Sequence, residues 1–333
     1  MEPIVIIAIV VFLALAFDFI NGFHDTANAI ATSVSTRALS PRNAILLAAS
    51  LNFVGALTFT GVAKSIGGKV ADPAALDHGL EIIIAALLAA IAWNLITWWY
   101  GIPSSSSHAL IGSMAGAVVS AAGLQGINAS GFTSIVKGLI FSPIIAFVVG
   151  FILMKLIYWI FASFSPHRIN KSFRTMQIIT ASFQSFTHGT NDAQKAMGVI
   201  TFALVAGGLQ SDLEVPLWVK IAAATAMGLG TAMGGWKIIK TMGTKIFKIE
   251  PANGFAADLT SSSVILGATL TGFPVSTTHV VTSGILGVGA SKRFRDVNWG
   301  VAGKIILTWF ITIPITALLA AIMFKVIWFL FLQ

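Results

Sequence analysis

The stretch PSSSSH at residues 103–108 returns in the second half of the chain as PVSTTH at residues 274–279. A second pair of similar stretches precedes them, GFHDTAN at 22–28 and GTNDAQK at 189–195. The two offsets, 274 − 103 = 171 and 189 − 22 = 167, are nearly equal. Because similarity at a constant offset is the signature of an internal repeat, the sequence predicts a duplication that places the same polar chemistry in the protein twice.

The composition is that of a membrane protein. Hydrophobic residues make up 56% of the 333 residues and charged residues only 10%, whereas about 25% of the residues in soluble domains are charged. Alternating ten-residue strands are absent, so a helical bundle is favoured over a β-barrel. We therefore expect an all-α polytopic membrane protein, surrounded by lipid, with about 10–12 transmembrane or re-entrant helices of roughly 20 residues.

Apolar segments begin near Glu2 and recur almost to the C-terminus. The first of them lacks a basic start and a small-residue cleavage site, so it is expected to be a mature helix and not a signal peptide. The first and sixth segments are expected to be interrupted, near 21–28 and near 188–195. The expected segments are 3–36, 43–63, 79–100, 103–124, 133–161, 175–207, 216–236, 253–272, 274–290 and 298–331.

Basic residues gather in alternate loops, at 37–42, 163–174, 237–250 and 291–297. The positive-inside rule places these loops in the cytoplasm and both termini outside the cell. The formal charge of +8 therefore comes from basic loops that indicate the orientation of the chain in the membrane, and we expect no nucleic-acid partner. Each copy has an odd number of crossings, so the second enters the membrane from the opposite side. The expected organisation is a first inverted repeat at 1–162, a short cytoplasmic linker at 163–174 and a second inverted repeat at 175–333.

The hydroxyl-rich stretches point to an anion site. Pro103 and Pro274 each follow a Gly-x pair, so one helix should end before the proline and another begin just after it. The free N–H groups and positive dipole of a helix N-terminus favour an anion, and transporters with inverted repeats bind substrates at such broken helices. The alternative is that these hydroxyls only cap helices. The side chains expected to bind the anion are Ser104, Ser105, Ser106, Ser107, Ser276, Thr277 and Thr278.

Asp25 and Asp192 are repeated carboxylates inside apolar segments, where a charge is costly and is a functional hypothesis by default. Such a carboxylate can coordinate a cation, or it can accept a hydrogen bond from an anion that still carries a proton, which favours phosphate over sulfate. Thr26 and Gln194 are expected to add substrate contacts, and Asn28 and Asn191 to add ligands for a coupling cation. Lys195 is the one cationic residue inside a motif, and the structural interpretation predicts that it pairs with Asp192 within one helical turn. Asp18 and Asp258 could equally flank an interface.

Four of the six histidines, His24, His108, His188 and His279, lie in or beside the repeated motifs. We expect them to relay protons or to form structural hydrogen bonds. Copper or zinc binding is the alternative, but no cysteine or Glu-x-x-His pattern accompanies them, so we expect no metal site and no tightly bound cofactor. No P-loop, nucleophile elbow or dinucleotide motif is present, and we expect a protein that is not an enzyme.

Four motifs together resemble the inorganic phosphate transporter (PiT) family: GFHDTANAIAT at 22–32, IPSSSSHALIG at 102–112, HGTNDAQKAMG at 188–198 and FPVSTTHVVTSGILGVG at 273–289. The resemblance implies phosphate uptake by symport with protons or sodium, inverted repeats and a homodimer. It also implies a functional acid at Asp258, which would join the coupling-ion ligands. His24 stands where many sodium-coupled members have Asn, and Asn52 where some eukaryotic members have Glu. Both departures, and the short linker typical of the compact bacterial form, favour proton coupling.

The function expected from the sequence is a low-affinity, ion-coupled importer of inorganic phosphate in the plasma membrane. One midplane site would be exposed alternately to each side, and phosphate could travel as a neutral complex with a divalent metal. Three alternatives stay open. They are a sulfate–proton symporter on the same fold, an anion channel without coupling and a membrane-embedded phosphotransferase.

Overall fold

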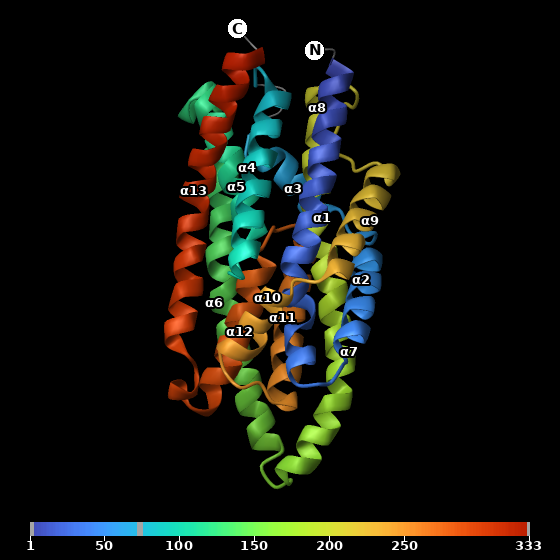
Figure 1. Cartoon of the computed structure of the whole chain (residues 1–333), viewed down its shortest axis with the longest axis vertical. Helices are drawn as coiled ribbons and strands as arrows, with labels where there is room; N and C mark the ends of the chain where they lie inside the picture. The colour runs from blue at the N-terminus through green and yellow to red at the C-terminus, as the bar shows by residue number, and fades with distance from the viewer. Residues whose placement is uncertain (1–2, 72–75, 332–333) are drawn as a thin grey trace.

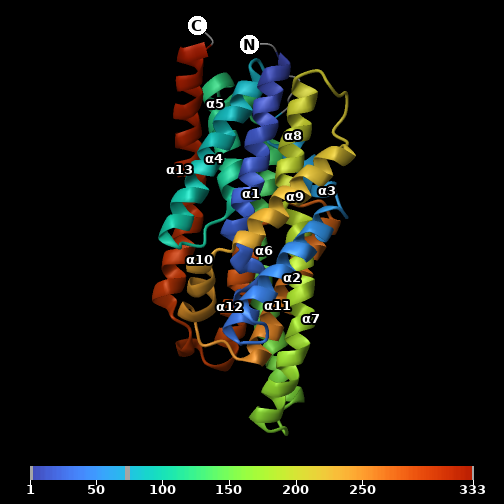
Figure 2. The same cartoon turned by 45° about the vertical axis from the view of Figure 1, so that its right-hand side comes forward.

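The computed structural model describes residues 3–71 and 76–331, which form an elongated bundle of helices (Figures 1 and 2). Within these ranges there is no strand, so the all-α fold is confirmed. The helices are α1 (Pro3–Ser35), α2 (Pro41–Ala56), α3 (Gly61–Lys69), α4 (Gly79–Tyr100), α5 (Ser106–Ala122), α6 (Ala129–Ile160), α7 (Pro166–Asp192), α8 (Gln194–Ala206), α9 (Leu217–Met233), α10 (Trp236–Lys240), α11 (Pro251–Leu270), α12 (Thr277–Lys292) and α13 (Trp299–Phe331), with short turns η2 (Leu124–Gly126), η3 (Thr241–Lys245) and η4 (Phe294–Asp296).

Four of the described helices, α1, α4, α6 and α13, are long and apolar enough to cross a bilayer alone. A fifth crossing is possible through α9 and the segment Trp236–Lys245, which are bent by 63° at the break between them. The apolar helix α5 has only 17 residues, fewer than the roughly 20 that a full crossing needs. The molecule therefore combines full-length spans with shorter helices that end inside it.

The helix breaks predicted at the two prolines are present. Helix α4 ends at Tyr100, its C-cap Gly101 has a left-handed φ of 66°, and α5 begins at Ser106. In the second half α11 ends at Leu270, Gly272 has a φ of 68°, and α12 begins at Thr277. Glycine adopts this left-handed conformation without the steric cost of a Cβ. Both breaks thus turn the chain before the hydroxyl-rich stretch.

The interruption expected near 21–28 is wrong, because α1 runs unbroken from Pro3 to Ser35. Its interior contains only one glycine, Gly22, and no proline, so nothing forces the backbone to leave the helical conformation. The interruption expected near 188–195 is present but small. A single residue, Ala193, separates α7 from α8, and its backbone stays in the right-handed helical region (φ −65°, ψ −23°).

The stretch at 163–174, expected to be the linker between the two copies, is mostly helical. Helix α7 begins at Pro166, so most of this stretch is helical. Proline is favoured at the first position of a helix because its φ is already helical and its missing N–H has no partner there. Ser165 before it is extended, with φ −66° and ψ 140°. The polar composition of the stretch reflects a helix that projects beyond the bundle with α6 (Figure 1).

The two halves of the chain are interlocked. Helix α5 of the first half packs most extensively against α13 of the second, and α12 of the second half packs most extensively against α6 of the first. In the same way, α1 packs most extensively against α9, and α2 against α7. Exchange of this kind is what two copies related by a two-fold axis would produce. It supports the predicted duplication, although the inverted topology of the copies stays a prediction.

Two apolar cores enclose a polar middle layer. One core contains Ile6, Val10 and Phe17 of α1 together with side chains of α3, α4, α5, α8 and α9. The other contains Ala27 and Ile30 of α1 together with side chains of α11, α12 and α13. The residues of α1 between these cores include the first motif carboxylate. The polar motifs therefore lie between two apolar layers, each of which separates them from one end of the molecule.

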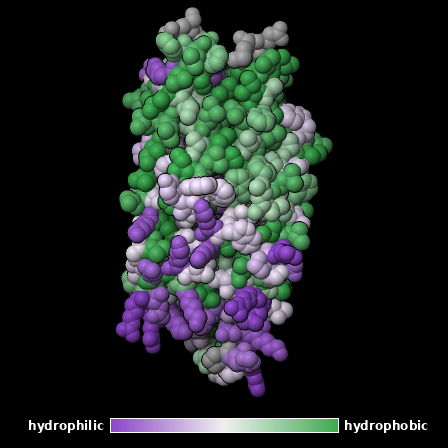
Figure 3. Space-filling view, in the orientation of Figure 1, coloured by the Kyte–Doolittle hydropathy of each residue, from purple (hydrophilic) through white to green (hydrophobic). Residues whose placement is uncertain are grey.

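Charge is distributed unevenly between the two ends. Both termini lie at one end (Figure 1), and hydrophilic residues gather chiefly at the other (Figure 3). The basic residues of that end come from the turn after α1, the α6–α7 hairpin and the turn between α12 and α13. They include Arg37, Arg42, Arg168, Lys171, Arg174, Lys292, Arg293 and Arg295.

We predict that Gly230→Ala will lower the thermal unfolding temperature of the protein in detergent. Gly230 of α9 faces the carbonyl oxygen of Phe19 in α1 so closely that an added Cβ would overlap it. Gly267→Ala in α11 is the matched control, because in residues 3–71 and 76–331 no atom outside the backbone of its own helix lies within 4 Å of its Cβ position. Alanine is favoured over glycine in a helix by about 1 kcal/mol, so the control should be neutral or stabilising. Equal unfolding temperatures for the two variants would contradict the close α1–α9 contact.

Candidate functional site

The two motif aspartates lie close together, with ligand atoms within 4.8 Å of each other, and a lysine is paired with one of them. Asp25 lies in the middle of α1 and Asp192 is the last residue of α7, and their side chains are 2% and 0% exposed. The ammonium of Lys195 lies 3.0 Å from Asp192 Oδ1 and donates a 2.8 Å hydrogen bond to Ser106 Oγ. Ser106 in turn donates to Asp25 Oδ2 at 3.2 Å. The predicted pairing of Lys195 with Asp192 is confirmed, and a chain of contacts connects both carboxylates.

The hydroxyl stretches from the two halves meet at this pair. Thr277 donates to Asp192 Oδ2 at 3.1 Å, and Thr278 donates to Asp25 Oδ1 at 3.4 Å. The amide of Asn28 donates to both threonine hydroxyls, at 3.3 and 3.0 Å. The N-termini of α5 and α12 therefore converge on the same carboxylates. Their hydroxyls, which are 1% exposed, are bonded to the aspartates in this structure.

The two helix starts have the same local geometry. The N-cap Ser105 of α5 accepts a hydrogen bond from the backbone N–H of His108 at 3.1 Å, and the N-cap Ser276 of α12 accepts one from His279 at 3.2 Å. Both N-caps are extended, with φ of −99° and −89°. A serine N-cap satisfies one free N–H of the first turn and leaves others unbonded within the helix. Each start thus keeps the positive end of a helix dipole directed at the site.

Each of the two carboxylates has a histidine side chain beside it. His24 Nδ1 lies 2.6 Å from Asp25 Oδ1, and its Nε2 lies 3.0 Å from Thr97 Oγ1. The Thr97 hydroxyl also lies 2.8 Å from the Ser104 hydroxyl, so Ser104 contacts the residue that supports His24. His188 Nε2 lies 3.4 Å from Asp192 Oδ2. These histidines are the two candidates that the structure brings to the carboxylates.

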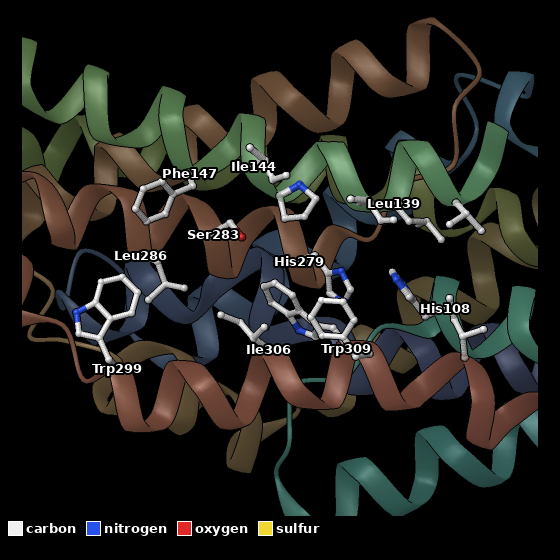
Figure 4. Close-up of a pocket in the computed structure, with 15 residues that line it drawn as sticks. His108, Leu139, Ile144, Phe147, His279, Ser283, Leu286, Trp299, Ile306 and Trp309 are labelled. Carbon is white, nitrogen blue, oxygen red and sulfur yellow. The ribbon is translucent and has the colours of Figure 1, made fainter. Parts of the chain in front are cut away.

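The other two histidines lie elsewhere. The rings of His108 and His279 are 4.3 Å apart, and His279 stacks on Trp309 at 4.0 Å. Both line an apolar cavity of about 440 Å³ between α5, α6, α12 and α13 (Figure 4), with walls that include Leu139 and Phe147. In the described structure neither ring bonds to a carboxylate, so a direct proton relay between these rings and the aspartates has no connecting contact here.

Thr26 and Gln194 also lie away from the predicted site. Thr26 donates to the carbonyl of Gly22 at 2.7 Å and lies 3.4 Å from the carbonyl of Thr231 in α9. Gln194 Oε1 accepts from the backbone N–H groups of Val62 and Ala63 at the start of α3, and its amide donates to Thr190. Both side chains use their polar atoms to hold helices together.

Asn191 and Asp258 form separate contacts on the two sides of the centre. Asn191 donates to Thr269 of α11 at 3.2 Å. Asp258 of α11 accepts from Thr32 of α1 at 2.5 Å and from Gln177 of α7 at 3.4 Å. In the described residues neither side chain has a hydrogen bond to Asp25 or Asp192. Asp258 nevertheless bonds to the same helix that carries Asp25.

Three residues at the site were given no ligand role from the sequence, and one of them, Asn52, was named only as a departure from the family pattern. Asn21 donates to Asp192 Oδ2 at 3.3 Å, Thr97 supports His24, and Asn52 lies 3.2 Å from His188 Nδ1 while donating to Thr231. Asn21 is one helical turn before Asp25, so a continuous helix would have placed both on one face. Thr97 and Asn52 belong to other helices, and no local signal connects them to the motifs.

The donor set could also hold a cation. Ligand atoms of Asp25, His188 and Asp192 all lie within 4.8 Å of one another. Carboxylate and imidazole donors suit several divalent ions, but the Lys195 ammonium already supplies one positive charge beside Asp192. A cation bound by both aspartates would therefore compete with the lysine for the same carboxylate.

We predict that Lys195→Gln will destabilise the protein strongly, because it leaves Asp192 buried without its cation. Removing one partner of a buried ion pair costs about 3–5 kcal/mol, whereas replacing both partners can be neutral. The double variant Asp192→Asn with Lys195→Gln should therefore unfold at a higher temperature than Lys195→Gln alone. Lys64→Gln is the control, since Lys64 and Glu214 form an exposed pair, which contributes about 0–1 kcal/mol. A double variant no more stable than the single one would contradict the pairing.

Comparison with known proteins gives a consistent result. A family profile described as the phosphate transporter family matches residues 21–320. A probable low-affinity inorganic phosphate transporter of Bacillus subtilis (strain 168) is 60% identical over 97% of this chain and 98% of its own length. A probable low-affinity inorganic phosphate transporter of Rhizobium meliloti (strain 1021) is 45% identical over 93% of each chain.

A solved structure, "The sodium-dependent phosphate transporter", has a TM-score of 0.89 to this structure at 25% identity, covering 98% of this chain and all of the other. The relatives are named as transporters, so the expectation that the protein is not an enzyme is confirmed. The matching motifs, the membrane helices and the long alignments agree. The chain belongs to the phosphate transporter family.

Proposed function

We propose that the protein imports inorganic phosphate across the plasma membrane by ion-coupled symport through one central site. The observation that carries the proposal is the buried pair of aspartates whose hydrogen-bond donors come from two opposed helix N-termini. Phosphate would take the hydroxyls and free N–H groups of α5 and α12, which favour an anion. The buried aspartates would accept hydrogen bonds from a phosphate that still carries a proton.

Both sides of this site are closed by apolar cores. Ser106 and Thr277 are each 1% exposed, so phosphate can reach them only after helices on one side move apart. Alternate opening of the two cores would give alternating access, as in other transporters built on broken helices. An uncoupled channel, the alternative from a different class, would need a continuous open path.

Import also depends on orientation. With the basic end in the cytoplasm, as the positive-inside rule expects, both termini lie outside the cell. The site would then load from the side of the termini and release phosphate at the basic end. The homodimer expected from the family resemblance is part of this proposal.

The coupling ion in this proposal is the proton. His24 lies 2.6 Å from Asp25, so an imidazole that can take up a proton contacts the central carboxylate directly. The solved relative is named sodium-dependent, and the departures at His24 and Asn52 argue for a different ion in this chain. Phosphate carried as a complex with a divalent metal is consistent with the donor set of Asp25, His188 and Asp192.

Transport into proteoliposomes tests the coupling. We expect radiolabelled phosphate to accumulate against its gradient when an inward pH gradient is imposed, and magnesium to increase uptake if a metal complex is carried. A sodium gradient at equal pH should give no accumulation. Accumulation with sodium alone would overturn proton coupling, and equilibration without accumulation under either gradient would indicate a channel.

We predict that alanine at Asp25 or at Asp192 will abolish phosphate uptake, because each removal takes away an acceptor for the protonated phosphate and a ligand for the coupling ion. Both variants should still insert into the membrane, and uptake is compared at a temperature at which each variant is folded, because Asp192→Ala also leaves the buried Lys195 ammonium without its partner. Asp296→Ala is the control, because Asp296 is exposed and lies outside the site. Near-normal uptake by both central variants would disprove this site assignment.

Competition separates phosphate from sulfate. Arsenate, which can carry a proton near neutral pH as phosphate does, should inhibit uptake of labelled phosphate. Molybdate and thiosulfate, which resemble sulfate, should inhibit weakly because they offer no proton to the aspartates. Strong inhibition by thiosulfate with weak inhibition by arsenate would favour the sulfate alternative.

A further inference from the structure

One face of α1 carries a continuous polar stripe. Its members follow each other at intervals of three or four residues, the spacing that keeps side chains on one face of a helix. All are 0–5% exposed. The stripe consists of Asp18, Asn21, Asp25, Asn28, Thr32 and Thr36.

Five of these six residues bond to side chains of other helices. Asn21 and Asn28 reach Asp192 and the threonines of α12, and Asp25 accepts from Ser106 and Thr278. Farther along, Thr32 donates to Asp258 and Thr36 to Gln177. The stripe thus connects the central carboxylates with the second buried acid, Asp258.

Asp18 is the exception. Its side chain is fully buried, yet neither carboxylate oxygen has a hydrogen-bond partner in residues 3–71 and 76–331. The amide of Asn94 on α4, a helix that packs against α1, is likewise buried and unbonded there. An isolated buried carboxylate costs far more than a hydrogen-bonded one, so such a group binds a proton or a cation.

Asp18 lies at the boundary between the first apolar core and the polar middle layer. It lies seven residues before Asp25, about 10 Å along the helix at 1.5 Å per residue. On the side of the termini, Val10, Ala14 and Phe17 of α1 are buried in the first apolar core. Asp18 is therefore the first polar member of the stripe that water would meet if that core opened.

The charges around Asp18 favour a proton over a metal ion. The charged side chains that act on it are Lys195 on α8 and Asp192 on α7, which oppose each other in sign. The remaining titratable groups of the centre, His24, Asp25 and His188, are engaged with one another or with Asp192. Asp18 does not belong to the group of side chains that could share a metal ion.

We propose that Asp18 binds the coupling proton on the outer side of the phosphate site. This inference rests on the proposed function of phosphate–proton symport. When the outer core opens, the Asp18 carboxylate takes a proton from external water and becomes a neutral acid, which allows the apolar core to close over it. When the protein opens to the cytoplasm, the same O–H bond breaks and the proton leaves to water with phosphate.

The variant that tests the proposal is Asp18→Asn, which keeps the shape of the side chain but cannot exchange a proton. Two assays in the same proteoliposomes separate coupling from binding. One measures phosphate accumulation driven by an inward pH gradient. The other measures exchange of labelled for unlabelled phosphate at equal pH. Exchange requires phosphate to cross the membrane, but it does not require the proton-binding group to release its proton.

We expect Asp18→Asn to exchange phosphate at a rate near that of the wild type and to lose accumulation completely. Asp18→Glu should recover part of the accumulation, because it restores a carboxyl group. Asp296→Asn should behave as the wild type in both assays. Infrared difference spectra should contain a carbonyl stretch of a protonated carboxylic acid that is lost in Asp18→Asn and kept in Asp296→Asn.

The outcomes distinguish this inference from the function on which it rests. If wild-type protein fails to accumulate phosphate on a pH gradient, the proposed proton coupling is wrong whatever the variant does. If the wild type accumulates and Asp18→Asn does so equally well, Asp18 is not the proton-binding group. If Asp18→Asn elutes normally in detergent but loses exchange as well, Asp18 serves substrate binding and the proposal is overturned.

Discussion

Two carboxylates buried in the membrane interior must be neutralised, and the arrangement of the helices follows from that requirement. Lys195 and the hydroxyls of two helix N-termini supply the compensation for Asp25 and Asp192. These donors come from both halves of the chain, so the centre forms only when α1, α5, α7, α8 and α12 meet. The hydroxyls that stabilise the aspartates are also those proposed to bind phosphate. Substrate binding therefore has to replace hydrogen bonds of the protein itself, which connects occupancy of the site to helix movement.

Local chemistry determined which features could be predicted from the sequence. Pro103 and Pro274 end a helix for steric reasons, so both breaks and the hydroxyls at the new N-termini were foreseeable. Thr26 was expected to contact the substrate and an interruption was expected at 21–28, but α1 is continuous. In the continuous helix Thr26 is rotated by about 100° from Asp25, since a turn contains 3.6 residues. Its hydroxyl consequently bonds within α1 and approaches α9.

The direction in which a side chain points toward other helices could not be predicted in this way. His108 and His279 stand directly beside the hydroxyl motifs, yet their rings face an apolar cavity and each other. Each is three residues after its N-cap serine, and its backbone N–H bonds to that cap. Both rings line the cavity with side chains of α6 and α13, and His108 Nδ1 also lies 2.8 Å from Ser105 Oγ. The direction of such a ring depends on how α5 and α12 are rotated against their neighbours. A single sequence contains no local signal for that rotation.

One buried acid lies on each side of the Asp25–Asp192 pair along the polar stripe of α1. Asp18 belongs to the stripe, and Asp258 bonds to it through Thr32. Asp18 borders the core that faces the termini, and Asp258 bonds to Thr32 within the core of the basic end. The two acids differ in that Asp258 has hydrogen-bond donors, whereas Asp18 has none in residues 3–71 and 76–331. The absence of donors favours the neutral acid. With Asp18 as the proton-binding group, the two acids would have different roles, because Asp18 would exchange the proton while Asp258 joins α1, α7 and α11 through its hydrogen bonds.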